Sequence, residues 1–389
     1  MKYIDEFRDG RLAAGLARAI AREADPGRDY AFMEFCGGHT HAIARYAVTD
    51  LLPPTVRMIH GPGCPVCVLP IGRIDLAIGL ALARPEVILC TYGDCLRVPA
   101  SGGLSLMKAR ARGADVRMVY SPADALALAL REPAREVVFF AIGFETTTPP
   151  TALVLHAAAV RQLDNFSVIC NHVLTPAAIA AILESPEVRE LGTVALDGFV
   201  GPAHVSTVIG SRPYERFAAA HRKPVVIAGF EPLDVIQAIR MLIRQVNDGR
   251  AEVENEFTRA VTRDGNRKAQ ALVAATFEPR PSFEWRGLGT VPDSALRIRP
   301  AFARWDAERK FALTDRPVPD HKACACGAIL RGVRTPADCK LFATACTPET
   351  PMGACMVSSE GACAAHYTYG RFRDAAHAVA PSLRSCRSE

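Results

Sequence analysis

Residues 136–145 read EVVFFAIGFE, and this stretch decides the fold class. Six consecutive apolar side chains lead up to Gly143, a pattern typical of a strand that is buried on both faces of a parallel sheet. Residues 151–162 follow with Ala and Leu at helical spacing. These two stretches together therefore predict a buried strand followed by a helix that covers the sheet.

The same pattern recurs on both sides of this stretch. Further apolar runs close on Gly, Cys, Asp or Pro, and they read YAFMEFCGG, VRMIHGPG, EVILCTYGD, VRMVYSP, FSVICNHV, GTVALDGFVG and KPVVIAGFEP. Ala- and Leu-rich stretches with helical spacing lie between them, at 74–83, 122–131 and 176–183. This alternation predicts an α/β fold with two Rossmann-like lobes, each built on a parallel sheet.

The length of 389 residues favours more than one hydrophobic core. We predict an N-terminal helix within residues 1–30 that packs on the C-terminal domain, a first α/β lobe at 31–163 and a second at 164–246. Residues 247–389 lose the strand pattern and become rich in Pro, Gly and Cys. We predict that this last part is a mainly helical and loop iron-sulfur domain, which needs its cofactor to hold its shape.

Composition excludes several classes of protein. The 46 basic and 41 acidic residues are spread along the chain, without the runs of like charge that nucleic-acid-binding segments carry. The N-terminus is interrupted by charges, unlike a secretory signal, and no apolar run is long enough to span a bilayer. We expect a cytoplasmic protein that binds neither nucleic acid nor membrane. In that compartment the 13 cysteines indicate a metal site or a redox device rather than a disulfide framework.

Unusual residues follow the predicted strands directly, at 36–41 (CGGHTH), 61–67 (GPGCPVC) and 143–147 (GFETT). Ligands of open parallel sheets bind beyond the carboxyl ends of the strands, so we expect these loops to face one cleft. Cys36, His39 and His41 together offer a thiolate and two imidazoles, which suit a soft metal such as iron. Alternatively, Cys36 is a small buried hydrophobe and the histidines are a helix cap and a surface residue.

Two other segments carry chemistry of their own. Cys64 and Cys67 form a C-x-x-C pair whose spacing suits a disulfide or a metal clip, although both could be structural. Glu145 stands at a strand end, where a carboxylate could accept a proton or orient a histidine. A role at a helix N-terminus is equally open for it. We interpret Cys90, Cys95, Cys170 and Cys386 as core or surface thiols.

The tail carries the strongest signal, because six cysteines occur within 40 residues, at positions 324, 326, 339, 346, 355 and 363. Their wide, uneven gaps suit zinc poorly but fit the four thiolates of a [4Fe-4S] cluster. Two cysteines would remain, which could form a redox dithiol beside the cluster. Zinc, or no metal at all, are the alternatives.

These segments together resemble the HypD family of hydrogenase maturation factors. The resemblance rests on CGGHTH, GPGCPVC and GFETT, on GPAHVSTVIG at 201–210 and AGFEP at 228–232, and on the cysteine-rich segment at 324–369. It implies a metallochaperone that assembles the Fe(CN)₂CO group of [NiFe]-hydrogenase together with a HypC-type small chaperone and a HypE-type cyanide donor. The hydrogenase large subunit would be contacted only indirectly, and we expect the free protein to be a monomer.

The resemblance also implies roles for individual residues. Cys36 would hold the iron, His39 would lie at a nearby essential position, and Cys64 and Cys67 would act as thiols in the same cleft. By analogy with a related reductase, Cys326 and Cys355 would form the dithiol. The cluster would then be held by Cys324, Cys339, Cys346 and Cys363. The competing hypothesis is a cluster-dependent thiol-disulfide oxidoreductase that acts on a protein partner and needs no iron at Cys36.

Overall fold

The computed structural model describes residue 2, residues 4–192 and residues 194–372. Two parallel sheets form its framework, and all eight predicted strands are present. The first sheet has the order β2-β1-β7-β8-β9, with β1 (Tyr30–Glu34), β2 (Val56–His60), β7 (Gly198–Gly201), β8 (Val225–Ile227) and β9 (Val253–Asn255). The second has the order β4-β3-β5-β6, with β3 (Val87–Thr91), β4 (Asp115–Met118), β5 (Glu136–Gly143) and β6 (Phe166–His172). The predicted α/β fold with parallel sheets is confirmed.

Helices separate the strands as the spacing predicts. The helical stretches predicted at 74–83, 122–131, 151–162 and 176–183 correspond to α4 (Ile71–Ala83), α6 (Pro122–Arg131), α7 (Thr148–Val160) and α8 (Thr175–Glu184). The remaining helices up to residue 276 are α1 (Gly10–Glu23), α2 (Gly37–Arg45), α3 (Pro65–Val68), α5 (Leu106–Ala111), α9 (Pro186–Glu190), α10 (Ala203–Ile209), α11 (Pro213–His221), α12 (Pro232–Asn247) and α13 (Arg267–Thr276). None of the helices in the described part of the chain is long and apolar enough to cross a bilayer.

Strand pairing crosses the division that the sequence predicts at residues 163 and 164. β6 lies beyond that point but pairs with β5 along its whole length, from Phe166 opposite Val137 to His172 opposite Gly143. β1 and β2, in turn, share a sheet with β7, β8 and β9. The chain therefore starts the first sheet, builds all of the second and then returns to the first. Composition does not reveal this return, because strands of both sheets are equally apolar.

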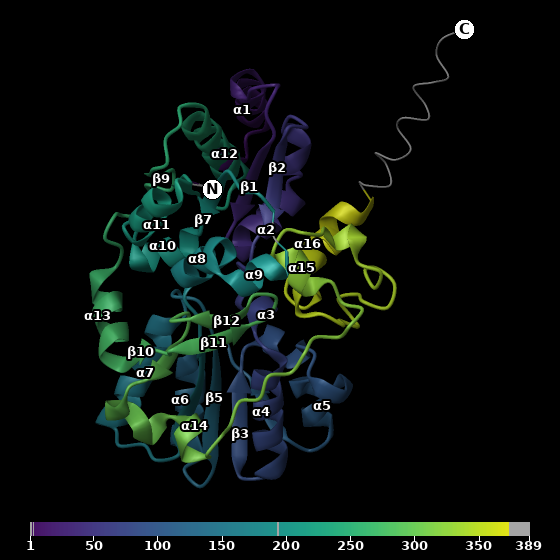
Figure 1. The fold of residues 1–389 in the computed structure, drawn as a ribbon. Helices are drawn as coiled ribbons and strands as arrows, with labels where there is room; N and C mark the ends of the chain where they lie inside the picture. The colour runs from purple at the N-terminus through teal and green to yellow at the C-terminus, as the bar shows by residue number, and fades with distance from the viewer. Residues whose placement is uncertain (1, 3, 193, 373–389) are drawn as a thin grey trace.

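The N-terminal helix α1 packs on α12 rather than on the C-terminal domain, where the sequence predicts it (Figure 1). Ile20 is fully buried in a hydrophobic cluster that includes Ile239 and Leu242. At the end of α1, Glu23 accepts hydrogen bonds from Arg240 and Arg244 of α12. Apolar burial and these ion pairs together fix the helix to the lobe of the first sheet.

The C-terminal part contains more strand than the sequence predicts. Residues 277–298 form two antiparallel pairs, β10 (Phe277–Pro279) with β13 (Leu296–Ile298) and β11 (Ser282–Trp285) with β12 (Gly289–Pro292). The cysteine-rich segment follows with the short helices α14 (Ala307–Lys310), α15 (Cys326–Leu330) and α16 (Ala362–Ala365). Ile329, Leu330 and Met356 join the main hydrophobic core. Figure 1 shows this segment in yellow-green beside α2 and α3, where the two lobes meet.

Candidate functional site

A cleft of about 550 Å³ lies where the carboxyl ends of the two sheets meet. Its walls come from the loops after β1, β2, β3, β4, β5 and β7, and they include Cys36, Cys64, Asp94, Tyr120, Thr146 and His204. In each sheet the strand order reverses between two neighbouring strands, β1 and β7 in the first and β3 and β5 in the second. Such switch points are where open α/β sheets bind their ligands. The predicted convergence of three loops on one cleft is present in the structure.

Close backbone packing brings Cys36 and Cys64 to the same wall. The Gly37 N–H donates to the carbonyl oxygen of Gly63 over 3.0 Å, so the two loops touch. A Cβ atom on Gly63 would lie 2.4 Å from the Cys36 nitrogen, and only glycine fits there. The GPG turn before Cys64 therefore places its thiol in the same cavity as that of Cys36.

Beneath Cys36 lies a buried carboxylate that the sequence reasoning missed. Glu34 is completely buried at the end of β1 and accepts the Cys36 N–H over 2.9 Å. The same carboxylate accepts the Thr40 hydroxyl, and it lies 3.0 Å from His60 Nδ1. These three contacts fix the backbone from which the Cys36 thiol projects. A glutamate in the middle of an otherwise apolar run was the only signal in the sequence.

The cleft carries negative charge without a basic counterpart. Glu360 and Asp94 line it, whereas its walls contain neither Lys nor Arg among the described residues. Burial raises the pKa of the Cys36 thiol, and the nearby charges of Glu360 and Glu34 raise it further. A metal cation in the cleft would reverse this effect, because it stabilises a bound thiolate. The electrostatics of the cleft therefore favour a cation beside Cys36.

The two predicted histidines of the CGGHTH loop lie outside this cavity. His39 is buried behind the wall, with Nε2 3.0 Å from the carbonyl oxygens of both Ala228 and Gly229. Burial lowers the pKa of His39, so the ring is neutral and Nε2 carries the proton. His41 faces the cysteine-rich segment, where its ring packs against Tyr369. The imidazole that does line the cleft is that of His204, from the GPAHVSTVIG segment.

His204 nevertheless connects to His39 through a shared aromatic neighbour. Phe230 lies 4.1 Å from the His204 ring and 4.9 Å from the His39 ring, measured between ring centroids. Burial lowers the pKa of His204, and the neighbouring His39 lowers it further. His39 thus supports the wall that carries His204, and the chemical roles of His39 and His41 stay predictions.

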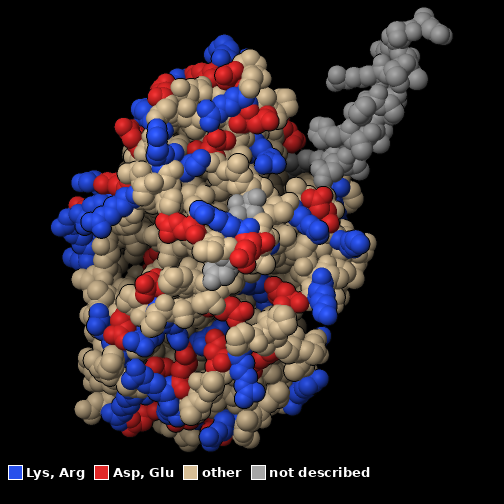
Figure 2. Space-filling view, viewed as in Figure 1, with Lys and Arg blue, Asp and Glu red and all other residues tan. Residues whose placement is uncertain are grey.

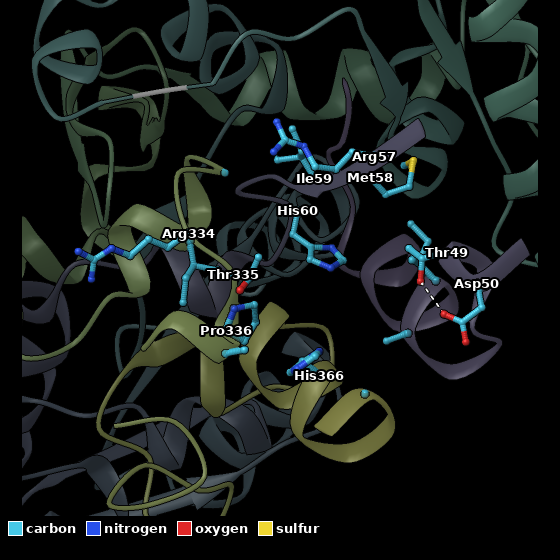
Figure 3. Close-up of a pocket in the computed structure, with 16 residues that line it drawn as sticks. Thr49, Asp50, Arg57, Met58, Ile59, His60, Arg334, Thr335, Pro336 and His366 are labelled. Carbon is cyan, nitrogen blue, oxygen red and sulfur yellow. Dashed lines mark hydrogen bonds between the residues drawn. The ribbon is translucent and has the colours of Figure 1, made fainter. Parts of the chain in front are cut away.

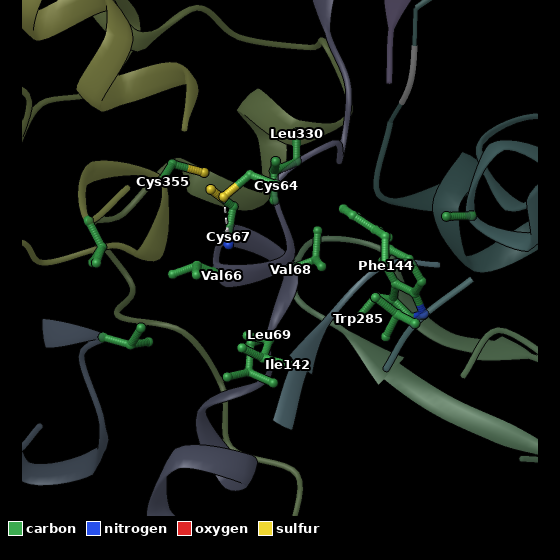
Figure 4. Close-up of a cluster of buried hydrophobic side chains, with 14 of the residues drawn as sticks. Cys64, Val66, Cys67, Val68, Leu69, Ile142, Phe144, Trp285, Leu330 and Cys355 are labelled. Carbon is green, nitrogen blue, oxygen red and sulfur yellow. Dashed lines mark hydrogen bonds between the residues drawn. The ribbon is translucent and has the colours of Figure 1, made fainter. Parts of the chain in front are cut away.

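A series of thiols leads from the cleft into the cysteine-rich segment. Cys64 caps α3, and its sulfur accepts the Cys67 N–H over 3.3 Å. The Cys67 thiol is fully buried, so it lies behind the cleft wall rather than in the cleft. It is within hydrogen-bonding reach of Cys355, and Cys355 is within reach of Cys326. Figure 4 shows the sulfurs of Cys64, Cys67 and Cys355 pointing toward one another.

All six tail cysteines line a single small cavity, together with Leu341, Phe342, Gly353 and Met356. Five of them are buried, and Cys324 is partly exposed. The described residues contain no group of three His, Cys, Asp or Glu side chains around a single metal ion. That result does not conflict with a cubane cluster, in which each thiolate binds a different iron atom.

The surroundings of this cavity fit a [4Fe-4S] cluster. The Met352 N–H donates to the Cys346 sulfur over 3.3 Å, a contact that stabilises a thiolate. A Cβ atom on Gly353 would lie 2.5 Å from the Cys324 sulfur, so a side chain there would enter the cavity. Apolar Leu341, Phe342 and Met356 shield the remaining wall. These residues therefore fit the predicted [4Fe-4S] cluster. Which four of the six tail cysteines bind it stays a prediction.

Glu145 is buried away from the cleft. One of its carboxylate oxygens accepts the N–H of Thr175, the first residue of α8, over 2.9 Å, and the other accepts the Thr175 hydroxyl over 3.0 Å. These contacts agree with the alternative that Glu145 binds the N-terminus of a helix. The helix is α8, however, and not α7, which follows Glu145 in the sequence. Its proposed part in catalysis stays a prediction without support from these contacts.

This burial makes Glu145 a source of pH-dependent stability. Burial raises its pKa from 4.5 to about 7. Below pH 4.5 the carboxyl is protonated in both the folded and the unfolded chain, whereas above pH 7 the folded chain must hold a buried charge. We expect the free energy of unfolding to fall by at most about 3 kcal/mol between those pH values in urea titrations. Glu145→Gln should remove the Glu145 contribution and leave a smaller slope, because burial also raises the pKa of Glu256 to about 7. The exposed Glu190→Gln should keep the full slope, and an equal slope in all three proteins would contradict the assignment.

The other predicted thiols lie in several places. Cys90 and Cys170 are buried in the core of the second sheet, as expected for core thiols. Cys95 is fully buried yet lines the cleft, and burial raises its pKa to about 12. Cys386 lies outside the described residues.

Acidic and basic side chains are interspersed over the visible face of the molecule (Figure 2).

Comparisons with known proteins cover nearly the whole chain. A family model named HypD, described as hydrogenase formation hypA family, matches residues 11–370. The hydrogenase maturation factor HypD of Cupriavidus necator is 74% identical over 96% of this chain and 98% of its own length. The protein of that name from Rhizobium leguminosarum bv. viciae is 71% identical over 96% and 97%. The Escherichia coli protein is 45% identical over 95% and 98%. With the family model and these relatives covering nearly all of it, the chain belongs to the HypD family.

Proposed function

We propose that this protein serves hydrogenase maturation as a scaffold that holds iron at Cys36, jointly with a HypC-type partner, while the Fe(CN)₂CO group is assembled. Membership of the HypD family supports the general role. The observation that carries the specific proposal is the cleft, where the Cys36 and Cys64 thiols lie with Asp94 and Glu360 and without Lys or Arg in the described walls. Such a site attracts a cation and offers it a soft sulfur ligand. Iron is the cargo of this site.

The second part of the proposal concerns cyanide, delivered by a HypE-type partner as a thiocyanate on a cysteine sulfur. The thiolate of Cys64 attacks that sulfur, a sulfur–sulfur bond forms, and the bond between sulfur and cyanide breaks. Cys67 then attacks the mixed disulfide, which leaves a Cys64–Cys67 disulfide and restores the partner's thiol. The dithiol supplies both electrons, and its two protons pass to the partner's thiolate and to solvent. Cyanide is released beside Cys36.

The buried thiols behind Cys67 would reduce the Cys64–Cys67 disulfide back to two thiols. Cys67 contacts Cys355, and Cys355 contacts Cys326, so a disulfide can pass inward by successive exchange. Burial and neighbouring thiols raise the pKa values of Cys67, Cys326 and Cys355, which slows spontaneous reaction until a partner or metal activates them. A [4Fe-4S] cluster held by Cys324, Cys339, Cys346 and Cys363 would supply electrons one at a time from an external donor protein.

Cyanide release tests this proposal directly. The reduced protein, mixed anaerobically with a peptide that carries an S-cyanylated cysteine and without added reductant, should release cyanide and acquire a disulfide between Cys64 and Cys67. Cys64→Ser should lower the yield at least about tenfold, whereas Cys67→Ser should still release cyanide but keep the peptide bound to Cys64, because the mixed disulfide cannot be resolved. Cys170→Ser, a buried thiol outside the series, should release as much cyanide as the natural chain. A disulfide found elsewhere by peptide mass mapping would contradict the assignment.

The same thiol series would also serve the alternative, a cluster-dependent thiol-disulfide oxidoreductase acting on a protein partner. The position of Cys36 separates the two functions. A reductase has no use for a further thiol set among carboxylates beside Cys64, and it should retain full activity after Cys36→Ala. The scaffold function predicts that this variant still releases cyanide but holds no iron.

A further inference from the structure

The thiol series passes from the α/β lobes to the cysteine-rich segment at the contact between Cys67 and Cys355. Cys67 belongs to α3, which follows β2, whereas Cys355 lies in the 3₁₀ turn Ala354–Met356 of the cysteine-rich segment. The two thiols are within hydrogen-bonding reach of each other. Disulfide exchange requires one sulfur to approach another closely and in line. The geometry of this contact therefore governs exchange between the cleft and the cysteine-rich segment.

Close backbone packing lets these two sulfurs meet. A Cβ atom on Gly361 would lie 2.3 Å from the carbonyl oxygen of Cys355 and 3.0 Å from the Cys67 sulfur, so a larger residue there would push the two apart. The turn that carries Cys355 also packs on α3 and is buried in the main hydrophobic core. Apolar packing has no preferred direction, however, and does not by itself orient the Cys355 sulfur.

Arg97 supplies contacts that have a direction. Its Nη1 donates to the carbonyl oxygen of Pro348 over 3.0 Å, and its Nη2 donates to that of Val357 over 2.8 Å. Residues 348–357, which we call the Cys355 loop, begin and end at these two carbonyls. Because the guanidinium group is planar and rigid, one side chain holds both ends of the Cys355 loop at a fixed separation.

The position of Arg97 in the chain connects this loop to the cleft. Arg97 is the last residue of the 3₁₀ turn Gly93–Arg97, which follows β3, and Asp94 of the same turn lines the cleft. On the other side of the two hydrogen bonds, Glu360 follows Val357 by three residues and also lines the cleft. Arg97 therefore joins the lobe of the second sheet to the part of the cysteine-rich segment that carries Cys355.

Toward the lobe of the first sheet the cysteine-rich segment is packed less closely. A cavity of about 400 Å³ lies between β2 and this segment. Figure 3 shows His60 of β2 and His366 of the cysteine-rich segment on opposite sides of the cavity, with the Arg334 guanidinium group directed away from it. Because side chains do not fill this space, β2 does not press the cysteine-rich segment into place there.

The other thiol of the tail dithiol, Cys326, is held by a different arginine. Cys326 begins α15, and Arg331 directly follows that helix. Arg331 donates to the carbonyl oxygens of Leu191 and Gly192, over 3.0 Å in each case. Loss of the Arg97 side chain should therefore loosen the Cys355 loop and leave Cys326 in place.

From these contacts, and on the basis of the function proposed above, we propose that Arg97 is a positioning residue for thiol exchange. By holding the two ends of the Cys355 loop, Arg97 keeps the Cys355 sulfur against that of Cys67. It takes no part in the chemistry itself, and its loss should affect one step of the series and not the others.

The step concerned moves a disulfide inward. The Cys355 thiolate attacks the Cys67 sulfur of the Cys64–Cys67 disulfide, a bond between Cys355 and Cys67 forms, and Cys64 leaves as a thiolate that takes up the proton lost by Cys355. Cys326 then attacks the Cys355 sulfur, and Cys67 leaves in the same way. The disulfide ends between Cys326 and Cys355, and no external electrons are needed.

Oxidation of the reduced full chain by one equivalent of diamide tests the proposal without cyanide or iron. Diamide takes two electrons and two protons from a pair of thiols and leaves a disulfide. All proteins in the test carry Cys36→Ala, so that Cys64 cannot pair with Cys36 in the cleft. Samples are quenched with acid at increasing times and alkylated, and their disulfides are located by peptide mass mapping.

The two disulfides should appear in sequence, first between Cys64 and Cys67 and later between Cys326 and Cys355. Arg97→Gln should form the first at an unchanged rate, which also shows that the variant is folded. It should slow the transfer to the second at least about tenfold, because a displacement of roughly 1 Å between reacting atoms can cost about a hundredfold in rate.

Two further variants separate positioning from a general structural effect. Arg97→Lys keeps the charge but can reach only one of the two carbonyl oxygens, so its transfer rate should lie between those of Arg97→Gln and the parent chain. Arg135→Gln is the matched control, because Arg135 also donates to two backbone carbonyls, those of Pro85 and Glu86, before the start of β3. It should transfer the disulfide at the parent rate.

Transfer at the parent rate in Arg97→Gln would overturn the proposal, as would equal slowing by Arg135→Gln or equal slowing of both steps by Arg97→Gln. A parent chain whose disulfide stays between Cys64 and Cys67 would overturn it together with the proposed reduction of that pair. Failure of the proposed cyanide chemistry would show separately, as an S-cyanylated peptide that releases no cyanide.

Discussion

Cys36→Ala is expected to abolish the infrared bands of iron-bound cyanide and carbon monoxide in protein purified anaerobically with its HypC-type partner. These stretches fall in a spectral region free of protein bands, so their loss is measured directly. The physical reason is that Cys36 offers a soft thiolate at the carboxyl end of β1, among carboxylates that attract the cation. Alanine keeps the fold and removes the only sulfur at that position.

A matched control exists in the same cavity. Cys95 is as deeply buried as Cys36 and lines the same cleft, but it follows β3 on the opposite wall. Cys95→Ala should leave the bands unchanged. Both variants should keep the visible colour of the iron-sulfur cluster, because neither residue lines the cavity of the six tail cysteines. Bands that persist in Cys36→Ala, or vanish equally in Cys95→Ala, would exclude Cys36 as the iron ligand.

The second large effect is expected at the cysteine-rich cavity. Replacing Cys324, Cys339, Cys346 or Cys363 by alanine should remove the visible absorbance of anaerobically purified protein, because a cubane that loses one of its four thiolates is not retained. Cys326→Ala and Cys355→Ala should keep that absorbance. In both variants the Cys64–Cys67 disulfide should no longer be reduced back to the dithiol. Iron and sulfide analysis of each variant gives the same answer independently.

Cys170→Ala is the control for this series, since that thiol is buried in the second sheet and donates to the Leu296 carbonyl oxygen. This variant should retain both the visible colour and the reduction of the Cys64–Cys67 disulfide. If Cys326→Ala were colourless and Cys324→Ala coloured, the division between ligands and dithiol would have to be exchanged. A colourless natural chain containing zinc would contradict the cluster altogether.

The fold and the candidate site were predictable to different degrees. The eight strands are found where apolar runs end in turn residues, and four helices are found where Ala and Leu repeat at helical spacing, because both signals are local. β9, with three half-buried residues, lacks such a run and was missed. The short antiparallel pairs of residues 277–298 were missed for the same reason, since their strands have only three or four residues.

Among the site residues, sequence reasoning found those whose chemistry stands out in a loop. Cys36, Cys64 and the six tail cysteines are gathered as expected. It missed Glu34, Glu360 and His60, because a lone carboxylate or imidazole carries no signal until its neighbours are known. It left Glu145 open between a catalytic role and a helix N-terminus, and the structure shows that carboxylate bound to Thr175 at the start of α8.

By itself, then, the sequence determined the α/β class, the position of each predicted strand and the presence of two groups of thiols. Only the tertiary structure decided that β1 and β2 join β7 rather than β3, that Glu34 links His60 to Cys36, and that Cys67 touches Cys355. The reason is physical. Hydrophobic periodicity and turn chemistry act between neighbours in the chain, whereas sheet order and side-chain contacts depend on segments that pack together across hundreds of residues.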